Sequence, residues 1–191
     1  MNMPHPMQMS AADTALLVVD VQEKLMVKIP SADALVRNIA FLIDAARLLG
    51  LPVQATEQYP KGLGPTVAEL AKRIPDRPDK KSFSCCAVLQ VIENLRLQAR
   101  PKVLLCGIEA HVCVQQTALD LLALDFRVFI AADAVASRYD VDKEFALRRL
   151  AQAGCVLTTA ESAVFEWTAG SDHPKFKDIS KLVQERMLSL D

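Results

Sequence analysis

The sequence has no apolar stretch long enough to cross a membrane. Charges such as Asp44 and Asp125 interrupt its longest hydrophobic stretches, and a bilayer span needs ~20 apolar residues. The N-terminal segment MNMPHPMQMS lacks the basic start and the continuous apolar stretch of a signal peptide, and it lacks the Arg of a transit peptide. We therefore expect a soluble, cytoplasmic protein with no membrane partner, in which residues 1–13 form a flexible tail.

A strong net charge is also missing. The 22 Lys and Arg residues nearly balance the 23 Asp and Glu residues, so the formal net charge is −1. A bulk field that would attract nucleic acid is therefore absent. We expect a small-molecule substrate and no nucleic-acid partner.

Several motifs of metal, nucleotide and serine chemistry do not occur. The sequence contains no GxGxxG, GxxxxGK[ST], HExxH or GxSxG pattern, and its three histidines are too few for a histidine-rich metal site. Its five cysteines have no repeated CxxC spacing, which argues against a disulfide framework and against a zinc knuckle. We expect no metal and no cofactor, and we expect most cysteines to be buried as small hydrophobic residues.

What is present is an ordinary globular composition. Hydrophobic residues make up 51% and charged residues 24% of 191 residues, which is enough for one domain with its own core. We expect this domain to cover residues 14–191.

Short apolar runs alternate with segments of helical periodicity along the chain. The expected strands are 15–20, 52–56, 82–84, 102–106, 126–131 and 155–158, and the expected helices are 31–49, 65–74, 87–99, 111–124, 141–153, 162–167 and 176–188. Six strands that alternate with helices indicate an α/β fold with a three-layer, doubly wound, six-stranded and mostly parallel sheet. Ligands of such folds bind beyond the carboxyl ends of the strands.

Asp20 and a lysine pair are the first candidates for chemistry. Asp20 ends the first expected strand after four apolar residues, where a desolvated carboxylate is a competent general base and a helix cap or turn is the alternative. Lys80 and Lys81 precede the third expected strand. Spacing does not choose between these two lysines, and a solvated pair is the usual explanation.

Cys113 lies in the first turn of the helix expected after strand 102–106. Backbone N–H groups and the helix dipole there favour a thiolate, and the alternative is a buried cysteine that faces the sheet. His111 precedes Cys113 by two residues, and side chains at that spacing on a helix do not face one another. We therefore interpret His111 as a helix-start residue.

Four segments form a recognisable set of motifs, namely LLVVDVQ at 16–22, KKSFS at 80–84, GIEAHVC at 107–113 and ADAVASR at 132–138. In this order they resemble the isochorismatase-like hydrolase superfamily, over about Thr14 to Lys181. TEQYPKGLGPTVAEL at 56–70 and GIEAHVCVQQTALDLL at 107–122 are similar to the isochorismatase domain-containing subgroup, whose members mostly lack an assigned substrate. The resemblance implies a Rossmann-like, six-stranded parallel sheet and a homo-oligomer, either a dimer or larger.

The resemblance also implies a catalytic triad of Asp20, Lys80 and Cys113. It selects Lys80, because the family pattern of a lysine, two residues, an aromatic residue and then a serine or aspartate fits that position. It further implies a cis peptide bond between Ile108 and Glu109. The backbone N–H groups of Glu109 and Cys113 would then form an oxyanion hole.

Two departures from better-characterised members narrow the expected reaction. Enzymes that hydrolyse isochorismate lack the nucleophilic cysteine, so Cys113 favours covalent chemistry. Nicotinamidases of the superfamily carry an Asp-x-His metal motif where this chain has Glu57-Gln58-Tyr59, so neither a metal nor nicotinamide is implied. The sequence predicts a metal-independent cysteine hydrolase of a small amide or related acyl compound, which acts through a thioester. A non-catalytic interaction protein that retains the fold is one alternative, and a thiol redox sensor that uses Cys113 with a resolving cysteine is another.

Four residues near the triad are candidates for substrate binding: Gln22, Gln58, Tyr59 and Phe83. For the two glutamines the alternative is that they satisfy loop backbone groups, and for the two aromatic residues it is that they pack.

Two further expectations concern the second half of the chain. Asp133 and Arg138 are expected to form a structural pair after the fifth strand. The apolar segment that contains Val164, Phe165 and Trp167 serves either an interface between subunits or the core.

Overall fold

The computed structural model describes residues 5–188, and its strands form one sheet. The strands are β1 (Thr14–Val19), β2 (Val53–Gln58), β3 (Asp79–Lys80), β4 (Lys102–Ile108), β5 (Arg127–Ala136) and β6 (Val156–Thr158). They lie in the order β3-β2-β1-β4-β5-β6, and all neighbouring strands are parallel. Because the strand order reverses between β1 and β4, the sheet is doubly wound, and the predicted fold class is confirmed.

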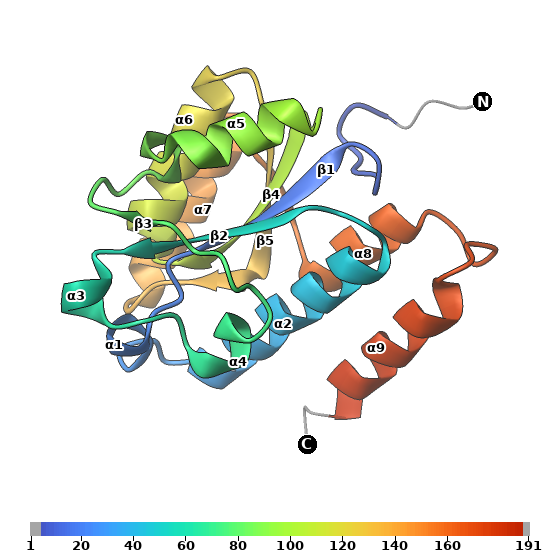
Figure 1. Cartoon of the computed structure of the whole chain (residues 1–191), viewed down its shortest axis with the longest axis horizontal. Coiled ribbons are helices and arrows are strands. Elements are labelled where there is room, and N and C mark those ends of the chain that lie inside the picture. Colours follow the sequence, from blue (N-terminus) through green and yellow to red (C-terminus); the bar gives the residue numbers. More distant parts are fainter. Residues whose placement is uncertain (1–4, 189–191) are drawn as a thin grey trace.

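Helices cover both faces of this sheet (Figure 1). They are α1 (Glu23–Met26), α2 (Ala32–Leu48), α3 (Pro60–Leu63), α4 (Ala68–Ala71), α5 (Leu89–Leu97), α6 (Gln115–Ala123), α7 (Asp140–Gln152), α8 (Ala160–Thr168) and α9 (Phe176–Leu188), with a 3₁₀ turn η1 (Cys85–Ala87) and a π-helical turn η2 (Ala110–Val114). Helices α5, α6 and α7 lie on one face, and α2 and α8 lie on the other with α9 beside them. The result is three layers.

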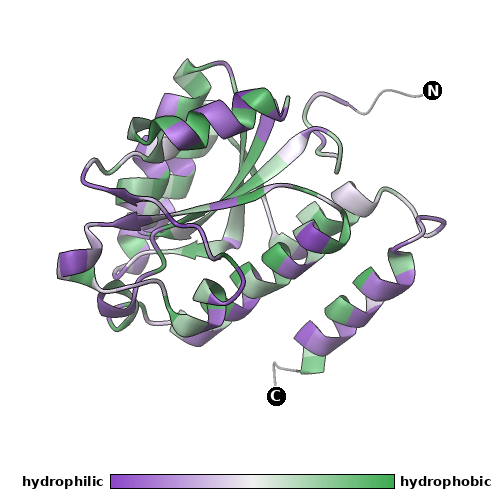
Figure 2. Cartoon of the chain, viewed as in Figure 1, coloured by the Kyte–Doolittle hydropathy of each residue, from purple (hydrophilic) through white to green (hydrophobic). Residues whose placement is uncertain are grey.

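Strand β1 shows why the apolar runs predict a sheet that is buried on both faces. Leu16 and Val18 pack in the cluster that includes α2 and α8, and Leu17 and Val19 pack in the cluster that includes α5 and α6. Successive side chains of a strand point to opposite faces. An uninterrupted apolar strand is therefore stable only when both faces are covered. The covering helices, such as α5 and α9, carry both hydrophobic and hydrophilic residues (Figure 2).

The third strand and the helix around Cys113 differ from their predicted positions. Residues 82–84 bend instead of forming a strand, because the Ser82 and Phe83 carbonyls accept hydrogen bonds from the Lys80 ammonium, and the short strand is Asp79–Lys80. The helix predicted at 111–124 begins as η2 and becomes α-helical only at Gln115. These differences shift local bounds and leave the order of elements unchanged.

The described part of the predicted flexible tail is held against the fold from Met9 onward. The Met9 side chain is buried in the core, and its N–H donates to Glu166 at 2.7 Å. Asp13 forms an ion pair with Lys102 at 2.7 Å. The prediction of a loose tail is therefore wrong for residues 9–13, because an apolar side chain and a buried lysine hold them. Residues 1–4 of that prediction lie outside the described residues, as do residues 189–191 of the predicted domain.

The predicted pair of Asp133 and Arg138 is also wrong. Strand β5 continues past the predicted end, so Asp133 lies within it and pairs with Arg186 of α9 at 3.0 Å. Arg138 falls beyond the end of β5 and pairs with Glu109 at 2.9 Å. The two residues serve different elements.

The apolar C-terminal segment belongs largely to the core. Val164 and Trp167 are buried against α2, whereas Phe165 is exposed. Of the two alternatives, core packing accounts for Val164 and Trp167. Among residues 5–188, no helix is both long and apolar enough to span a membrane.

Candidate active site

Asp20 lies at the carboxyl end of β1, where the chain turns out of the sheet. Its side chain is 0% exposed, and its φ of 49° lies in the left-handed region, which aspartate tolerates better than most residues. Its N–H donates to the Thr56 carbonyl at 3.3 Å, and its carbonyl accepts from the Gln22 N–H at 2.8 Å. The turn is thus held by backbone hydrogen bonds on both sides of the carboxylate.

Lys80 brings a buried positive charge to this carboxylate. Its Nζ lies 2.6 Å from Asp20 Oδ2 and also donates to Gln58 Oε1 at 2.8 Å and to the Phe83 carbonyl at 2.9 Å. Lys81 is exposed to solvent instead. Because every donor of Lys80 has an acceptor, the ammonium tolerates burial and its position is fixed.

Cys113 reaches the same carboxylate from η2, beyond the end of β4. Its side chain is buried, and its thiol interacts electrostatically with the Asp20 carboxylate. Burial raises the pKa of the Cys113 thiol, the negative charge of Asp20 raises it further, and the positive charge of Lys80 offsets only part of this. These effects oppose the helix start, which is expected to favour a thiolate at Cys113. Cys113 holds its proton beside a carboxylate that can accept it.

A glycine allows β4 to approach β1 closely just before this turn. Gly107 has a φ of +114°, and a Cβ built on it would overlap the Val19 carbonyl oxygen. Any other residue would push β4 away from β1 at the point where Asp20 follows Val19. Gly107 thus sets how closely the turn that carries Cys113 approaches Asp20.

Glu109 anchors that turn through its side chain, a role that the sequence analysis missed. The Ile108–Glu109 peptide bond is cis. The Glu109 carboxylate accepts hydrogen bonds from the Arg138 guanidinium at 2.9 and 3.0 Å and from the Arg138 N–H at 3.1 Å. Burial alone would raise the pKa of Glu109, but these bonds outweigh it and lower that pKa. His111 pairs with the Ser137 hydroxyl at 2.9 Å rather than with Cys113.

The two glutamines predicted to bind substrate form hydrogen bonds to loop backbone groups and to Lys80. The enclosed Gln22 side chain donates to the Gln58 and Gly64 carbonyls at 3.0 and 2.7 Å and accepts from the Gln58 N–H at 2.6 Å. The Gln58 amide binds the Lys80 ammonium and the Lys81 carbonyl. Backbone groups and a lysine thus occupy these amides, as in the alternative interpretation of the sequence.

The two predicted aromatic residues lie at the surface next to this site. Tyr59 is 51% exposed and Phe83 is 50% exposed. The Tyr59 N–H donates to the Lys80 carbonyl, and the Phe83 carbonyl accepts from the Lys80 ammonium. Their backbones are therefore held next to Lys80, and about half of each side chain is exposed to solvent.

Thr56 and Cys85 are further members of the site that no motif indicated. The Thr56 hydroxyl donates to Asp20 Oδ1 at 2.8 Å and lies 3.2 Å from Cys85 Sγ. Cys85 is enclosed, and this burial raises the pKa of its thiol to about 12. Only the sheet topology could have indicated Thr56, because β2 is adjacent to β1 and Thr56 pairs with Val19, the residue before Asp20.

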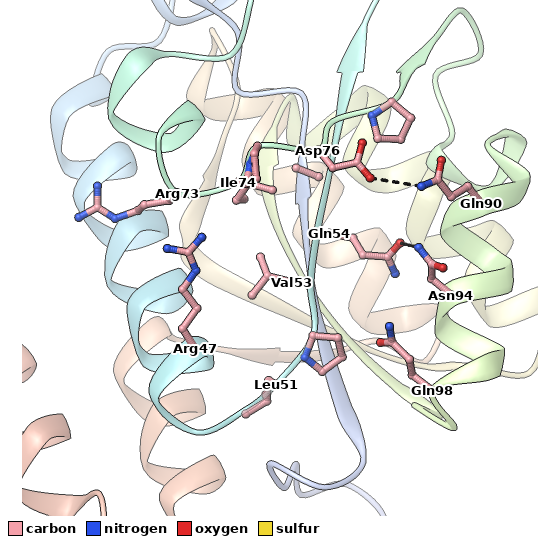
Figure 3. Close-up of a pocket in the computed structure, with 14 residues that line it drawn as sticks. Arg47, Leu51, Val53, Gln54, Arg73, Ile74, Asp76, Gln90, Asn94 and Gln98 are labelled. Atoms are coloured by element: carbon pink, nitrogen blue, oxygen red, sulfur yellow. Dashed lines mark hydrogen bonds between the residues drawn. The ribbon is translucent and has the colours of Figure 1, made fainter.

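A separate cavity of about 390 Å³ lies along the edge of β2, away from the triad (Figure 3). Its walls come from Arg47 of α2 and from Gln90 and Asn94 of α5, and Gln54 of β2 lies between them. This edge precedes the carboxyl end of β2, and no triad residue lines the cavity. Within the described part of the chain, no group of three or more His, Cys, Asp and Glu side chains is arranged to hold a metal ion.

Comparisons with known proteins agree with this architecture. Residues 14–162 match the model of the isochorismatase domain. The chain is 43% identical to isochorismatase domain-containing protein 2 of Danio rerio, with 92% of this chain and 89% of that protein aligned, and 37% identical to the secreted isochorismatase effector Isc1 of Phytophthora sojae, with 91% and 86% aligned.

A solved structure described as the MAR1 ribonuclease of Caenorhabditis elegans superposes with a TM-score of 0.88 at 42% identity, over 93% of this chain and 92% of that one. The matched sequence includes Asp20, Lys80 and Cys113 within residues 14–162. On this evidence, the chain belongs to the isochorismatase domain family.

Proposed function

We propose that this protein is a cysteine hydrolase of a small amide or related acyl compound, which works without a metal through a thioester on Cys113. The observation that carries the proposal is the buried carboxylate of Asp20, which forms an ion pair with the Lys80 ammonium and interacts electrostatically with the Cys113 thiol. A nucleophile, its base and a charge partner thereby share one buried site, which is the arrangement that covalent acyl transfer needs.

In the first half-reaction, Asp20 accepts the Cys113 proton while the sulfur attacks the carbonyl carbon of the substrate. The N–H groups of Glu109 and Cys113 are proposed to stabilise the oxyanion. Asp20 then returns the proton to the leaving nitrogen, the C–N bond breaks and a thioester remains. Such base assistance typically contributes ~10²- to 10⁴-fold to the rate.

In the second half-reaction, water replaces the amine. Asp20 takes a proton from the water as its oxygen attacks the thioester carbonyl, the C–S bond breaks and the sulfur recovers the proton. Lys80 stays charged throughout and offsets the negative charge that moves between Asp20 and the sulfur. The acid product then leaves, and Cys113 is again a thiol.

The raised pKa of Cys113 supports concerted proton transfer rather than a preformed thiolate. A buried thiol beside a carboxylate stays protonated until an electrophilic carbonyl approaches. The reaction is therefore coupled to substrate binding. We propose that the exposed rings of Tyr59 and Phe83 contact the substrate, while Gln22 and Gln58 hold the loops that carry them.

RNA cleavage is the second candidate function, because a relative at 42% identity is described as a ribonuclease. The site itself favours acyl chemistry, because its reactive atom is a sulfur next to a single carboxylate. The net charge of −1 also provides no general attraction for a polyanion.

An amide-hydrolysis panel that includes nicotinamide and short carbamoyl compounds tests the proposal. The wild type, Cys113→Ala and a matched Cys155→Ala control are assayed together, with a single-stranded RNA oligonucleotide as a parallel substrate. Cys155 is a buried cysteine outside the site.

We expect amide turnover by the wild type and by Cys155→Ala, and a loss of turnover of at least ~10³-fold in Cys113→Ala. Intact-mass measurement should also detect an acyl adduct on Cys113. Full activity of Cys113→Ala contradicts the mechanism, and RNA cleavage that depends on Cys113 establishes the second function. Absence of turnover on every substrate favours a non-catalytic protein.

Iodoacetamide labelling separates the hydrolase from the redox alternative. With limiting reagent and peptide mass spectrometry, Cys113 should be modified faster than Cys106 and Cys155, because only Cys113 of these three interacts with both the Asp20 carboxylate and the Lys80 ammonium. After treatment with mild peroxide, Cys113 should form no disulfide with any of the other four cysteines. A disulfide that forms on Cys113 and abolishes labelling would favour the redox sensor.

We also propose a cytoplasmic homo-oligomer. Tyr139, Val141 and Phe145 expose large apolar side chains on and beside the first turns of α7, which favours a covered surface. The five cysteines are all free thiols, as expected in a reducing compartment. Light scattering after size exclusion tests the assembly, and a monomer at micromolar concentration contradicts it.

A further inference from the structure

We propose that Thr56, supported by Cys85, is a positioning residue that orients the Asp20 carboxylate and limits how strongly it holds a proton. The inference rests on the proposed role of Asp20 as the acid and base of the reaction. Neither Thr56 nor Cys85 belongs to the predicted triad.

The direction of the hydrogen bonds follows from the groups involved. Thr56 Oγ1 is 2.8 Å from Asp20 Oδ1, and an ionised carboxylate only accepts, so the single hydroxyl proton of Thr56 points to Asp20. Cys85 Sγ lies 3.2 Å from Thr56 Oγ1. Because the hydroxyl proton of Thr56 is already used, the Cys85 S–H is the donor to Thr56. The raised pKa of Cys85 keeps this thiol protonated. The two bonds therefore form a chain of donors from Cys85 through Thr56 to Asp20.

The chain is enclosed and anchored. Thr56 is 1% exposed and Cys85 is 0% exposed, so water does not compete for either group. The Cys85 N–H donates to the Thr117 hydroxyl at 2.9 Å, which fixes the 3₁₀ turn η1 against α6. Hydrogen bonds in such a dry interior polarise one another.

The two oxygens of Asp20 are held by different donors. Lys80 binds Oδ2 at 2.6 Å and Thr56 binds Oδ1 at 2.8 Å, from β3 and β2 respectively. With Lys80 on one oxygen and Thr56 on the other, the plane of the carboxylate is fixed within the site that also contains Cys113. The titratable groups that interact with Asp20 are Lys80, Cys85 and Cys113.

This arrangement matters because Asp20 has to release protons as well as take them. In the proposed reaction it accepts a proton from Cys113, gives it to the leaving nitrogen and later accepts one from water. A hydrogen bond to the charged form of a carboxylate weakens it as a base. Without Thr56, Asp20 would take the thiol proton more readily and return it to the amine less readily.

The experiment measures these two steps separately in Thr56→Val and Thr56→Ser. The rate of Cys113 alkylation by iodoacetamide at pH 7.5, followed by peptide mass spectrometry, reports the transfer of the thiol proton and needs no substrate. We expect Thr56→Val to raise this rate by about tenfold, the effect of one charge-assisted hydrogen bond. Turnover of the best amide in the panel should fall by at least a similar factor. Thr56→Ser keeps the hydroxyl and should match the wild type in both measurements.

Cys85 provides a graded test of the same chain. Cys85→Ala removes the outer donor but leaves the Thr56 hydroxyl in place, so alkylation of Cys113 should rise by less than about threefold. Cys85→Ser restores a donor and should return the rate to that of the wild type. Circular dichroism verifies folding, and Thr56→Ala replaces Thr56→Val if the valine variant is unfolded.

The selectivity of alkylation distinguishes positioning from a loss of structure. The rise in Thr56→Val should be confined to Cys113, whereas a loss of structure would also raise the alkylation of the buried Cys106 and Cys155. An alkylation rate in Thr56→Val within twofold of the wild type, or below it, overturns the proposal. An equal rise in Thr56→Ser overturns it as well. The predicted alkylation pattern in a protein that hydrolyses no amide would support the Thr56 assignment and reject the hydrolase proposal, so the two failures are distinguishable.

Discussion

Replacement of Lys80 by methionine should severely destabilise the protein, because it leaves a buried carboxylate without its counter-ion. The side chains of Lys80 and Asp20 are 2% and 0% exposed, and their charged atoms are 2.6 Å apart. Methionine fills much of the volume but offers no donor, so Asp20 Oδ2 loses its ammonium partner while Oδ1 keeps the Thr56 hydroxyl. Removal of one partner from a buried pair costs about 3–5 kcal/mol. Because a domain has only about 5–15 kcal/mol of stability, the variant should fold with a small margin.

Urea unfolding followed by Trp167 fluorescence measures this loss. Trp167 is the one tryptophan of the sequence and is buried, so its emission reports the packed core. The free energy of unfolding of Lys80→Met should be lower than that of the wild type by about 3–5 kcal/mol at pH 7.5. Lys81→Met is the matched control, because Lys81 is exposed and its replacement should change stability by less than ~0.5 kcal/mol.

The double variant Asp20→Asn/Lys80→Met separates the lost charge pairing from lost packing. It removes both charges, so it should recover most of the stability that Lys80→Met loses. The reasoning is refuted if Lys80→Met loses less than ~1 kcal/mol, the range of an exposed pair. It is also refuted if the double variant is no more stable than Lys80→Met.

Two further predictions concern the backbone and the anchor of the Cys113 turn. Gly107→Ala should lower the free energy of unfolding by about 3 kcal/mol or more in urea unfolding, because its Cβ would overlap the Val19 carbonyl. Gly154 has a similar positive φ but open space around it, so Gly154→Ala should lose only about 1–2 kcal/mol in the same assay. Glu109→Gln should lose about 1 kcal/mol at pH 7, an amount limited by the half-exposed Arg138. Because the pKa of Glu109 is lowered on folding, its contribution is present above its usual value of 4.5 and is lost as the pH falls further. The difference between Glu109→Gln and the wild type should therefore shrink as the pH is lowered below 4.5, and a difference that stays unchanged there contradicts the assignment.

The order of elements and the location of the site could be predicted because both depend on local patterns. Uninterrupted apolar strands indicate a parallel sheet, and parallel strands end on the same edge. Asp20 and Cys113 follow β1 and β4, and these strands are neighbours. Any ligand-binding residues after them had to lie close together.

The choice between Lys80 and Lys81 shows the limit of spacing alone. Strand β3 has only two residues, too few to display an alternation that would assign one lysine to the inside. The resemblance selected Lys80, and the structure places Lys80 inside and Lys81 outside. What decides their burial is the acceptors around Asp20, which come from other elements.

The protonation of Cys113 and the role of Thr56 could not be read from the sequence for the same reason. Position near a helix start predicts a thiolate, but burial and the charge of Asp20 raise the pKa of the thiol through space. Thr56 is one of several polar residues in a strand, and only its hydrogen bond to Asp20 distinguishes it. The proton affinity of a side chain depends on which groups surround it in the folded structure. A linear sequence motif does not contain that information.

Stability alone does not account for the group of charges around Asp20. The residue combines a left-handed backbone, which is about 1–2 kcal/mol less favourable than the right-handed one for most residues, with a desolvated charge that costs several kcal/mol before pairing. Buried ion pairs are often no more stabilising than apolar residues of similar volume. Asparagine tolerates the same backbone as aspartate, so Asp20→Asn/Lys80→Met should be about as stable as the wild type. In that variant, Cys113 should lose its rapid alkylation, since no carboxylate remains to take the thiol proton. A stable protein with an unreactive cysteine would show that the pair serves proton transfer rather than folding.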